Sequence, residues 1–314
     1  MYNMGYGCAP IVMFVFNRPK HFLETVEALS KCPEASESEL FVFSDGPKTE
    51  KDSIKVSQVR KYVRMEMAKR RFANVRLEER KVNYGMAKNV IEAVTQVVNR
   101  YGRCIVVEDD ALCSPYLLKF FNSALDYYED NEKIGAIAGY TPGFEFPESY
   151  TKDYFTAYRP SSYSWAVWRR SWENVDWELK NIKDFYNDLS LVKKLNLNGT
   201  DRYDRLCKVA DGKSSSWSVR FHAHLVKNDL LTLYPRYSYI YNTGIDANAD
   251  ARQAIEDQNM NAIDLARAKD EIEFSDDIEP DADIQLAMRK HYSGDAVTEA
   301  KRFAKALFNK ATKR

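Results

Sequence analysis

The sequence predicts an α/β fold in which helices flank a mixed, mostly parallel sheet, and two observations support this prediction. Short apolar runs alternate with amphipathic stretches from about residue 10 to residue 140, which is the pattern of a largely parallel sheet covered by helices. The longest apolar runs have the length of strands, not of membrane spans. With 45 % hydrophobic residues, the 314-residue chain can also fill a full core.

The expected strands of the first half are five apolar runs at residues 11–16, 40–44, 75–77, 104–107 and 134–138. The helices expected between them lie near 21–30, 53–71, 85–100 and 114–129. In the third helix, apolar residues recur with the period of one helix face: Val90, Ile91, Val94, Val97 and Val98. We interpret these as packing positions against the sheet.

Charge and cysteine content narrow the class of function. The 46 basic and 46 acidic residues give a formal net charge of zero, which argues against binding bulk nucleic acid by electrostatics alone. Five widely spaced cysteines without a Cys-x-x-Cys pair favour reduced thiols in the cytoplasm. The N-terminus lacks the basic and apolar pattern of an export signal, so we expect a cytoplasmic protein.

Polar residues follow the first three expected strands. The first strand is followed by Asn17 and Arg18, the second by Asp45, and the loop after the third carries Asn83 and Tyr84. Ligands of open α/β sheets bind beyond the carboxyl ends of the strands. This arrangement predicts a ligand that carries phosphate or sugar.

Three acids in a row, Glu108, Asp109 and Asp110, directly follow the fourth expected strand. Crowded carboxylates at the end of a dry strand raise one another's pKa values and destabilise the fold unless a cation compensates them. Mg²⁺ or Mn²⁺, which takes oxygen ligands, is the simplest compensation. The alternative is a solvated acidic turn that caps the helix near Ser114, but the position after a central strand favours the metal site.

Four segments carry a family resemblance through their order and spacing: PIVMFVFNRP at 10–19, FVFSDG at 41–46, NYGMAKN at 83–89 and VVEDD at 106–110. The chain resembles nucleotide-sugar glycosyltransferases of the Rossmann-like GT-A fold over residues 8–245. It is most similar to bacterial polysaccharide sugar transferases related to N-acetylglucosaminyltransferases with a Glu-Asp-Asp motif. The resemblance implies a catalytic domain at 1–245, with a nucleotide-sugar-binding half at 8–140 and an acceptor-side half at 141–245.

The resemblance also implies roles for the residues at the strand ends. It assigns the nucleotide to Asn17, Arg18, Asp45, Asn83, Tyr84 and Lys88. Within this set, Asp45 would accept a hydrogen bond from the uracil or ribose. In the triplet, Asp110 would bind the metal directly, while Glu108 and Asp109 would hold ribose, donor-sugar hydroxyls or metal-bound water.

The implied activity is that of a metal-dependent glycosyltransferase of the hexosyltransferase type. It would move a sugar from a nucleoside-diphosphate sugar, with UDP as the expected nucleotide, to a saccharide or lipid-linked saccharide, with inversion, in surface polysaccharide biosynthesis. One alternative is a sugar nucleotidyltransferase, which usually has a Gly-rich phosphate loop, whereas residues 16–19 contain no glycine. The other alternative is a non-catalytic sugar-binding protein.

Aromatic residues crowd the segment 158–180, which contains four of the five tryptophans. We expect Tyr163 and Trp165 to lie in a Ser-rich loop and to offer a stacking face to a sugar ring. We group Trp217 with them as a residue that binds sugar or acceptor. The other three tryptophans of the segment are expected to pack inside a helix: Trp168, Trp172 and Trp177.

The catalytic base is expected to be a carboxylate, because inverting transfer needs one within reach of the acceptor hydroxyl. The resemblance places this acid just before a Trp that matches Trp217, but serines occupy those positions here. The remaining candidates are Asp211, Asp204 and Asp201. We prefer Asp211 because the flexible Gly212 beside it is typical of an active-site loop.

The C-terminal part changes character twice. Residues 246–295 form the expected acidic connector with helices, and the acidic run between 264 and 283 is expected to be solvated. Residues 296–314 carry six basic residues against Glu299, and their apolar residues fall within about 140° of helical arc: Val297, Ala300, Phe303, Ala304, Leu307, Phe308 and Ala311.

This pattern predicts a basic amphipathic helix that lies on an anionic membrane surface, with the protein peripheral on the inner face of the membrane. The alternative is a helix docked on the catalytic domain with its charges in solvent.

Overall fold

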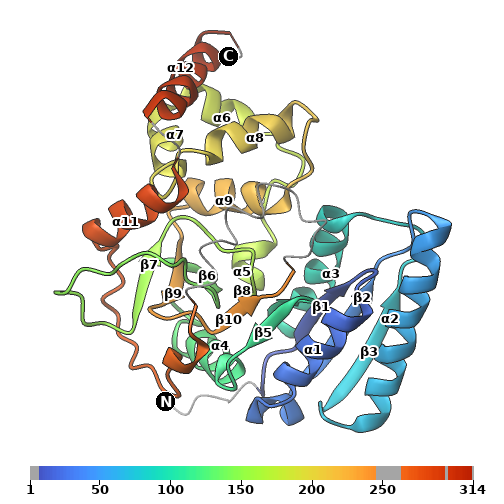
Figure 1. Cartoon of the computed structure of the whole chain (residues 1–314). Coiled ribbons are helices and arrows are strands. Elements are labelled where there is room, and N and C mark those ends of the chain that lie inside the picture. Colours follow the sequence, from blue (N-terminus) through green and yellow to red (C-terminus); the bar gives the residue numbers. More distant parts are fainter. Residues whose placement is uncertain (1–6, 245–262, 294–295, 313–314) are drawn as a thin grey trace.

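The computed structural model describes residues 7–244, 263–293 and 296–312, and its centre is one eight-stranded sheet (Figure 1). The strand order is β3-β2-β1-β4-β8-β6-β9-β7. Four of the seven neighbouring pairs are parallel, and three are antiparallel. A mixed, mostly parallel sheet flanked by helices was predicted, and the structure confirms this fold class.

The strands of this sheet are β1 (Ile11–Val15), β2 (Glu39–Ser44), β3 (Asn74–Glu79), β4 (Arg103–Glu108), β6 (Ile134–Ala138), β7 (Tyr154–Ala157), β8 (Trp165–Trp168) and β9 (Leu231–Pro235). A separate antiparallel pair consists of β5 (Ala111–Cys113) and β10 (Ile240–Asn242). All five strands predicted in the first half are present.

Helices cover both faces of the sheet. One face packs against α1 (Pro19–Leu29), α2 (Glu50–Lys69) and α4 (Leu117–Tyr127), and the other packs against α3 (Met86–Tyr101), α5 (Arg169–Trp172) and α9 (Trp217–Lys227). Residues on β1 show the division, because Met13 belongs to the first core and Val12 to the second. Both are completely buried.

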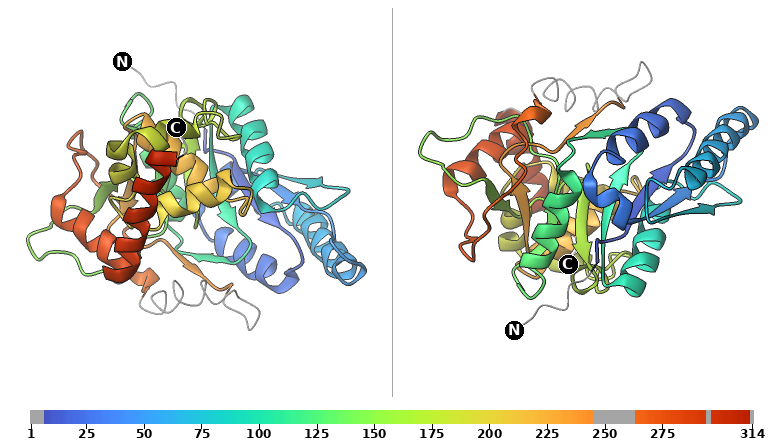
Figure 2. Two further views of the ribbon diagram at one scale, coloured as in Figure 1. Left: turned by 90° about the horizontal axis from the view of Figure 1, so that it is seen from above. Right: turned by 90° about the horizontal axis from the view of Figure 1, so that it is seen from below.

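A second helical layer lies beyond α9 (Figure 1). Its members are α6 (Ile182–Asn187), α7 (Leu189–Leu195), α8 (Arg202–Ala210) and α12 (Ala296–Thr312). α11 (Ala282–Tyr292) instead packs on β6, β7 and β9 through Ile284 and Met288. Figure 2 shows these C-terminal helices on one side of the molecule and α1, α2 and α3 on the other.

Local sequence signals position the helices around the carboxyl ends of β1 to β3. Pro19 begins α1, where its missing N–H is harmless. Thr49 and Asp52 form a reciprocal capping box at the start of α2. Gly85 precedes α3 with φ of +74°, a backbone conformation that residues with a side chain rarely adopt. The ends of these helices are therefore fixed beside the strand ends.

The segment 158–180 differs from its prediction. Trp165 and Trp168 are the first and last residues of the buried strand β8. Trp165 was expected in a loop and Trp168 in a helix. β8 runs antiparallel to both β4 and β6, so both of its edges are paired. Its two faces are buried in the two cores, Trp168 in one and Trp165 in the other. Trp172 does lie in a short helix and is completely buried, whereas Trp177 is partly exposed.

The acidic connector also differs in part. Residues 245–262, and with them the expected boundary at 245, lie outside the described residues. The described part contains the helical turn η3 (Leu265–Arg267) and the helix α11, and it buries Ile278. Tyr128 donates a hydrogen bond to the carbonyl of Ser275 at 2.8 Å. The acidic run is therefore packed on α4 and β7 as well as solvated.

No helix within the described ranges combines the length and the apolarity that a transmembrane helix needs.

Candidate functional site

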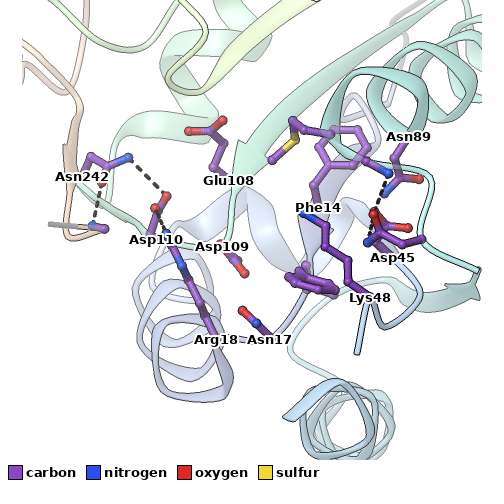
Figure 3. Close-up of a pocket in the computed structure, with 16 residues that line it drawn as sticks. Phe14, Asn17, Arg18, Asp45, Lys48, Asn89, Glu108, Asp109, Asp110 and Asn242 are labelled. Carbon is purple, nitrogen blue, oxygen red and sulfur yellow. Dashed lines mark hydrogen bonds and ion pairs between the residues drawn. The ribbon is translucent and has the colours of Figure 1, made fainter. Parts of the chain in front are cut away.

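A cavity of about 420 Å³ lies at the carboxyl edge of β1, β2 and β4 (Figure 3). Its size falls in the range of small-molecule sites. The lining residues come from the ends of β1 and β4, from the loops after β1 to β4, from the start of α3, and from the end of β10 and the residues after it: Phe14, Val15, Phe16, Asn17, Arg18, Asp45, Lys48, Asn83, Gly85, Met86, Asn89, Glu108, Asp109, Asp110, Asn242 and Gly244.

Most of the residues that the sequence predicted to bind the nucleotide or the metal line this cavity. Seven of them line it: Asn17, Arg18, Asp45, Asn83, Glu108, Asp109 and Asp110. Figure 3 shows Asp110 and Asn242 at one end, Asp45 and Asn89 at the other, and Glu108 and Asp109 between them. The strand ends therefore converge as their positions in the sequence indicated.

Asp110 is the best-fixed member of the triplet. Its Oδ2 lies 2.6 Å from a guanidinium nitrogen of Arg18, and its Oδ1 accepts a hydrogen bond from Asn242 at 3.2 Å. The backbone of Thr243 also donates to the Asp110 carbonyl at 2.7 Å. A Cβ at Gly244 would collide with Oδ2 of Asp110, so the glycine permits this close approach. Chain segments more than a hundred residues apart thus hold one carboxylate.

The other two acids have raised pKa values. Burial raises the pKa of Glu108 well above its ordinary value, and the negative charges of Asp110 and Asp109 add to the effect. Burial together with the Asp110 charge raises the pKa of Asp109 to about 7, against the opposing effect of Arg18. Ionising the whole triplet is therefore unfavourable without additional positive charge.

The residues present fit a hard divalent cation bound together with substrate. The three carboxylates of the triplet and that of Asp45 line one cavity, and Arg18 and Lys48 are the cationic side chains among its lining residues. Within the described residues, no cluster of three or more His, Cys, Asp and Glu has the arrangement of a metal site. Mg²⁺ sites of this kind commonly use one or two carboxylates and complete the coordination with phosphates and water. Asp110 is the candidate protein ligand.

Asp45 organises the loop after β3. Its Oδ1 accepts hydrogen bonds from the backbone of Gly46 at 2.8 Å and Tyr84 at 2.7 Å. Its Oδ2 accepts from the Asn83 side chain and the Gly85 backbone, each at 3.0 Å. Four donors thus surround a carboxylate that was predicted to contact the nucleoside. The structure shows Asp45 fixing the loop, and its contact with a nucleoside stays a prediction.

Tyr84 and Lys88 do not line the cavity, although the resemblance assigned them to the nucleotide. Tyr84 contacts two cations, with the Arg80 guanidinium 4.8 Å and the Lys88 ammonium 4.3 Å from its ring centroid. Lys88 is exposed and also lies 3.7 Å from Glu92. These residues support the start of α3 from outside.

Lys48, Asn89 and Asn242 line the cavity but were not among the predicted site residues. Lys48 follows the second strand by four residues, so the strand-end argument that selected Asp45 could have found it. Asn89 lies on the first turn of α3 beside Gly85. Asn242 ends β10, and nothing in the linear sequence indicates that β10 pairs with β5 next to the acid triplet.

The aromatic residues predicted to hold sugar lie elsewhere. Trp165 is only 2 % exposed and stacks on Trp217 at a centroid distance of 5.0 Å and on Trp172 at 5.4 Å. Trp217 is itself 8 % exposed. Tyr163 packs edge-on against Tyr140 at 5.2 Å. The expectation of an open stacking face at Trp165 is wrong, because its rings are covered by other aromatic rings.

None of the three proposed bases lines the cavity. Asp201 precedes α8 and lies 2.8 Å from Arg159 and 2.7 Å from Arg205. Burial alone would raise its pKa, but the charges of Arg159, Arg202 and Arg205 outweigh burial and hold the pKa well below the ordinary value. A carboxylate with so low a pKa is a weak base.

Asp204 and Asp211 lie at the two ends of the same short helix. Asp204 forms ion pairs with Lys208 at 2.6 Å and with Lys305. Burial opposes these two lysines, but their charges prevail and lower the pKa of Asp204. Asp211 follows the last turn of α8, is exposed and lies 3.6 Å from Lys213. Asp211 is therefore the most exposed of the three candidates.

A second cavity of about 620 Å³ lies at the same edge of the sheet. β6 and β9 are parallel to each other, and β6 runs in the direction of β4, so the loops after these strands emerge beside those of the first cavity. The loop after β6 contributes Phe144, Glu145 and Glu148 to its lining, and the loop after β9 contributes Arg236 and Tyr237. Sequence reasoning did not identify this cavity.

Comparison with known proteins gives distant structural similarity only. No protein family model matches the chain, and no curated protein matches its sequence. The mannosyltransferase PcManGT from Pyrobaculum calidifontis, solved with GDP-Man and Mn²⁺, is 13 % identical with a TM-score of 0.38, over 55 % of this chain and 48 % of that one.

TarS residues 1–349 from S. aureus, solved with UDP-GlcNAc, is 14 % identical with a TM-score of 0.43, over 81 % of this chain and 60 % of that one. The chain thus spans less than two thirds of either protein. At these scores the similarity carries no inference about activity.

Proposed function

We propose that this chain is a metal-dependent glycosyltransferase that uses a nucleoside-diphosphate sugar as donor, with UDP as the nucleotide. One observation carries the proposal: the ends of β1, β2 and β4 bring two cations and four carboxylates together in one cavity of about 420 Å³. Such a mixture suits a ligand that has both anionic phosphates and sugar hydroxyls. The proposed location is cytoplasmic.

Donor binding follows from the charges at the two ends of the cavity. Arg18 and Lys48 would contact the diphosphate, since charge-assisted hydrogen bonds to phosphate are the strong ones. Phe14, Phe16 and Met86 supply apolar lining suited to a nucleobase. Asn17, Asn83 and Asn89 supply amide groups for its polar edges. Asp45 keeps Asn83 in place through the hydrogen bond at 3.0 Å.

The acid triplet would hold Mn²⁺ or Mg²⁺. Asp110 would bind the ion, while Glu108 and Asp109 would hold water or sugar hydroxyls beside it. A bound divalent ion stabilises the charge that develops on a leaving nucleoside diphosphate. Asn242 and Gly244 would keep Asp110 oriented, as their contacts with it indicate.

The acceptor would approach from the second cavity, and transfer would occur with inversion. Phe144 and Tyr237 offer aromatic faces and Arg236 a hydrogen-bond donor, a combination suited to a saccharide. The proposed acceptor is a saccharide or lipid-linked saccharide of a surface polysaccharide. Asp211 remains the preferred base of the three acids from the sequence, and Glu145 and Glu148 are added as carboxylates that line this cavity.

The test is incubation of the full chain with Mn²⁺ and a panel of UDP-sugars and GDP-sugars, scored for released nucleoside diphosphate. Release from one donor that depends on the metal, and its loss in Asp110→Asn, supports the proposal. Release of pyrophosphate from sugar phosphate and nucleoside triphosphate would instead identify a nucleotidyltransferase. Absence of nucleotide binding across the panel would refute the proposal.

The base is tested separately, with an acceptor present. Removing a general base should slow transfer by about 10²–10⁴-fold while donor affinity is retained. Asp211→Asn, Glu145→Gln and Glu148→Gln are compared under the same conditions. Near-normal transfer eliminates the residue concerned, so the panel selects among the three.

A further inference from the structure

The C-terminal helix α12 docks on the protein through the opposite face from the one its sequence pattern suggests. The residues that contact α8 and the segment just before it are polar or small: Arg302, Lys305, Ala306 and Asn309. Arg302 donates to Thr200 at 2.8 Å, and Asn309 donates to the Tyr203 hydroxyl at 3.2 Å. Ala306 and Asn309 are 2 % and 3 % exposed.

This docking leaves the apolar face of the helix in solvent. We define the α12 stripe by its four large residues: Val297, Phe303, Leu307 and Phe308. They are 62 %, 53 %, 46 % and 64 % exposed. Ala300, Ala304 and Ala311 on the same arc are exposed too. Single exposed apolar residues are ordinary, but a contiguous stripe on one helix marks an interaction surface.

Cations border the α12 stripe on both sides. At about 100° per residue, Lys301 lies about 20° beyond Phe308 at one margin, and Lys310 lies about 20° beyond Phe303 at the other. Lys301 is exposed and Lys310 partly so. Glu299, the one acid in the sequence of residues 296–314, accepts a hydrogen bond from Arg289 of α11 at 3.1 Å. The stripe is therefore an apolar band with positive margins.

We propose that the α12 stripe inserts into the surface of an anionic phospholipid membrane and holds the protein there as a peripheral protein. Apolar side chains at the acyl boundary with Lys at the headgroups are the features of an interfacial helix. Charge decides against a second copy of the chain as the occupant. Pairing two stripes would bring their bordering lysines together without an acid on either stripe to compensate them.

The docked face makes a point variant a better test than truncation. Removing α12 would uncover Cys207 and Tyr203, to which Asn309 donates hydrogen bonds. The test variant is therefore Phe303→Ser/Phe308→Ser in the full chain, since both side chains are more than half exposed and should be replaceable without unfolding. The control is Ile54→Ser/Met65→Ser on α2, where exposure is 74 % and 51 %.

The experiment is flotation with phosphatidylcholine vesicles, with and without phosphatidylglycerol. Wild type and control should float with the anionic vesicles, and flotation should weaken as salt rises. Phe303→Ser/Phe308→Ser should lower the bound fraction at least about tenfold, and Lys301→Glu at least about fivefold. Circular dichroism and thermal unfolding check that each variant is folded.

Three outcomes would overturn the proposal. The first is equal flotation of wild type and the Phe variant. The second is absence of flotation with anionic vesicles. The third is a wild-type dimer in light scattering that the Phe variant converts to a monomer, which would make a second copy the occupant. No donor or acceptor is present in these measurements, so their result is independent of the proposed glycosyltransferase activity.

Discussion

Carboxylates have opposite surroundings at the cavity edge and in the helical layer. At the carboxyl ends of β1, β2 and β4, Glu108, Asp109 and Asp110 face one cavity, and their mutual repulsion and burial raise the pKa values of the first two. In the helical layer, Asp201 and Asp204 each contact two cations and have lowered pKa values.

The difference separates binding chemistry from structural chemistry. A carboxylate whose charge is compensated by neighbouring side chains cannot be removed without exposing those charges, and it has little left for a ligand. A group of carboxylates with incomplete compensation is costly for the fold and useful for a cation or a hydroxyl. Mutating one acid from each region should therefore affect different measurements.

The largest expected effect is on turnover in Asp110→Asn. The amide keeps the size of the side chain but loses the charge that the proposed metal needs, so turnover should fall at least about 10³-fold, or roughly 4 kcal/mol of transition-state stabilisation. Thermal unfolding should change little, because the amide oxygen can still accept from Arg18 or Asn242. Calorimetry with UDP and Mn²⁺ checks the binding step. Unchanged metal-dependent affinity would remove Asp110 from the metal site.

The second effect is on stability, in Asp201→Asn. The substitution removes the negative charge that pairs with the Arg159 guanidinium, which is 3 % exposed. Breaking such a buried pair should destabilise the protein by about 3 kcal/mol near neutral pH. Denaturant unfolding measures it. Asp204→Asn is the matched control and should cost less, because Lys208 reaches solvent. UDP affinity should be unchanged in both, and a loss in Asp201→Asn would contradict the division between the regions.

The pH dependence of this second effect has a definite sign. The pKa of Asp201 is lowered in the folded protein, because Arg159, Arg202 and Arg205 outweigh burial. Its stabilisation is therefore fully present above the unfolded-state pKa of about 3.9 and is lost as pH falls below it. The stability difference between wild type and Asp201→Asn should shrink on acidification below about pH 4. A difference that is constant from neutral to acid pH would be inconsistent with this assignment.

The difference between the cavity edge and the helical layer also explains how much of the structure could be predicted from the sequence. The cavity edge was predictable because each parallel strand is a continuous apolar run and its functional residues follow directly, as Arg18 follows β1 and Asp110 follows β4. The helical layer was not, because its important contacts join residues with no shared local pattern. Arg159 and Asp201 are 42 residues apart and meet only in the folded chain.

Two predictions were wrong or incomplete because the local sequence pattern carries no information about tertiary contacts. The run from Trp165 to Trp168 is too short to distinguish strand from helix, and antiparallel pairing with β4 and β6 decides the matter. The amphipathic pattern of residues 296–314 predicted a helix, and α12 is present over Ala296–Thr312. It could not show that the polar face docks, since that depends on Thr200 and Tyr203 lying in the right place on another element.

A smaller effect is expected for Asp45→Asn, which tests a structural carboxylate at the cavity edge itself. The amide cannot accept from all four donors that surround Asp45, so the free energy of unfolding should fall by about 2 kcal/mol. Displacement of Asn83 should weaken UDP and UDP-sugar binding by similar factors. Asn83→Ala, which removes one of the four donors, is the control and should be milder. An effect confined to one donor sugar would place Asp45 in the sugar pocket instead.

The smallest expected effect is on UDP affinity, in variants of two lysines that follow neighbouring strands. Comparing them tests which residues belong to the cavity. Lys48 lines the cavity, so Lys48→Ala should weaken UDP affinity about tenfold, the value of one charge-assisted hydrogen bond. Lys88 is exposed and contacts Tyr84 and Glu92 outside the cavity. Lys88→Ala should therefore change UDP affinity less than about twofold and stability by less than about 0.5 kcal/mol. Calorimetric titration of both variants at two salt concentrations measures this, because loss of a phosphate contact also flattens the salt dependence. Equal weakening of UDP binding by Lys88→Ala and Lys48→Ala would contradict this boundary. The start of α3 would then have to approach the nucleotide, and Lys88 would return to the nucleotide site, where the resemblance had placed it.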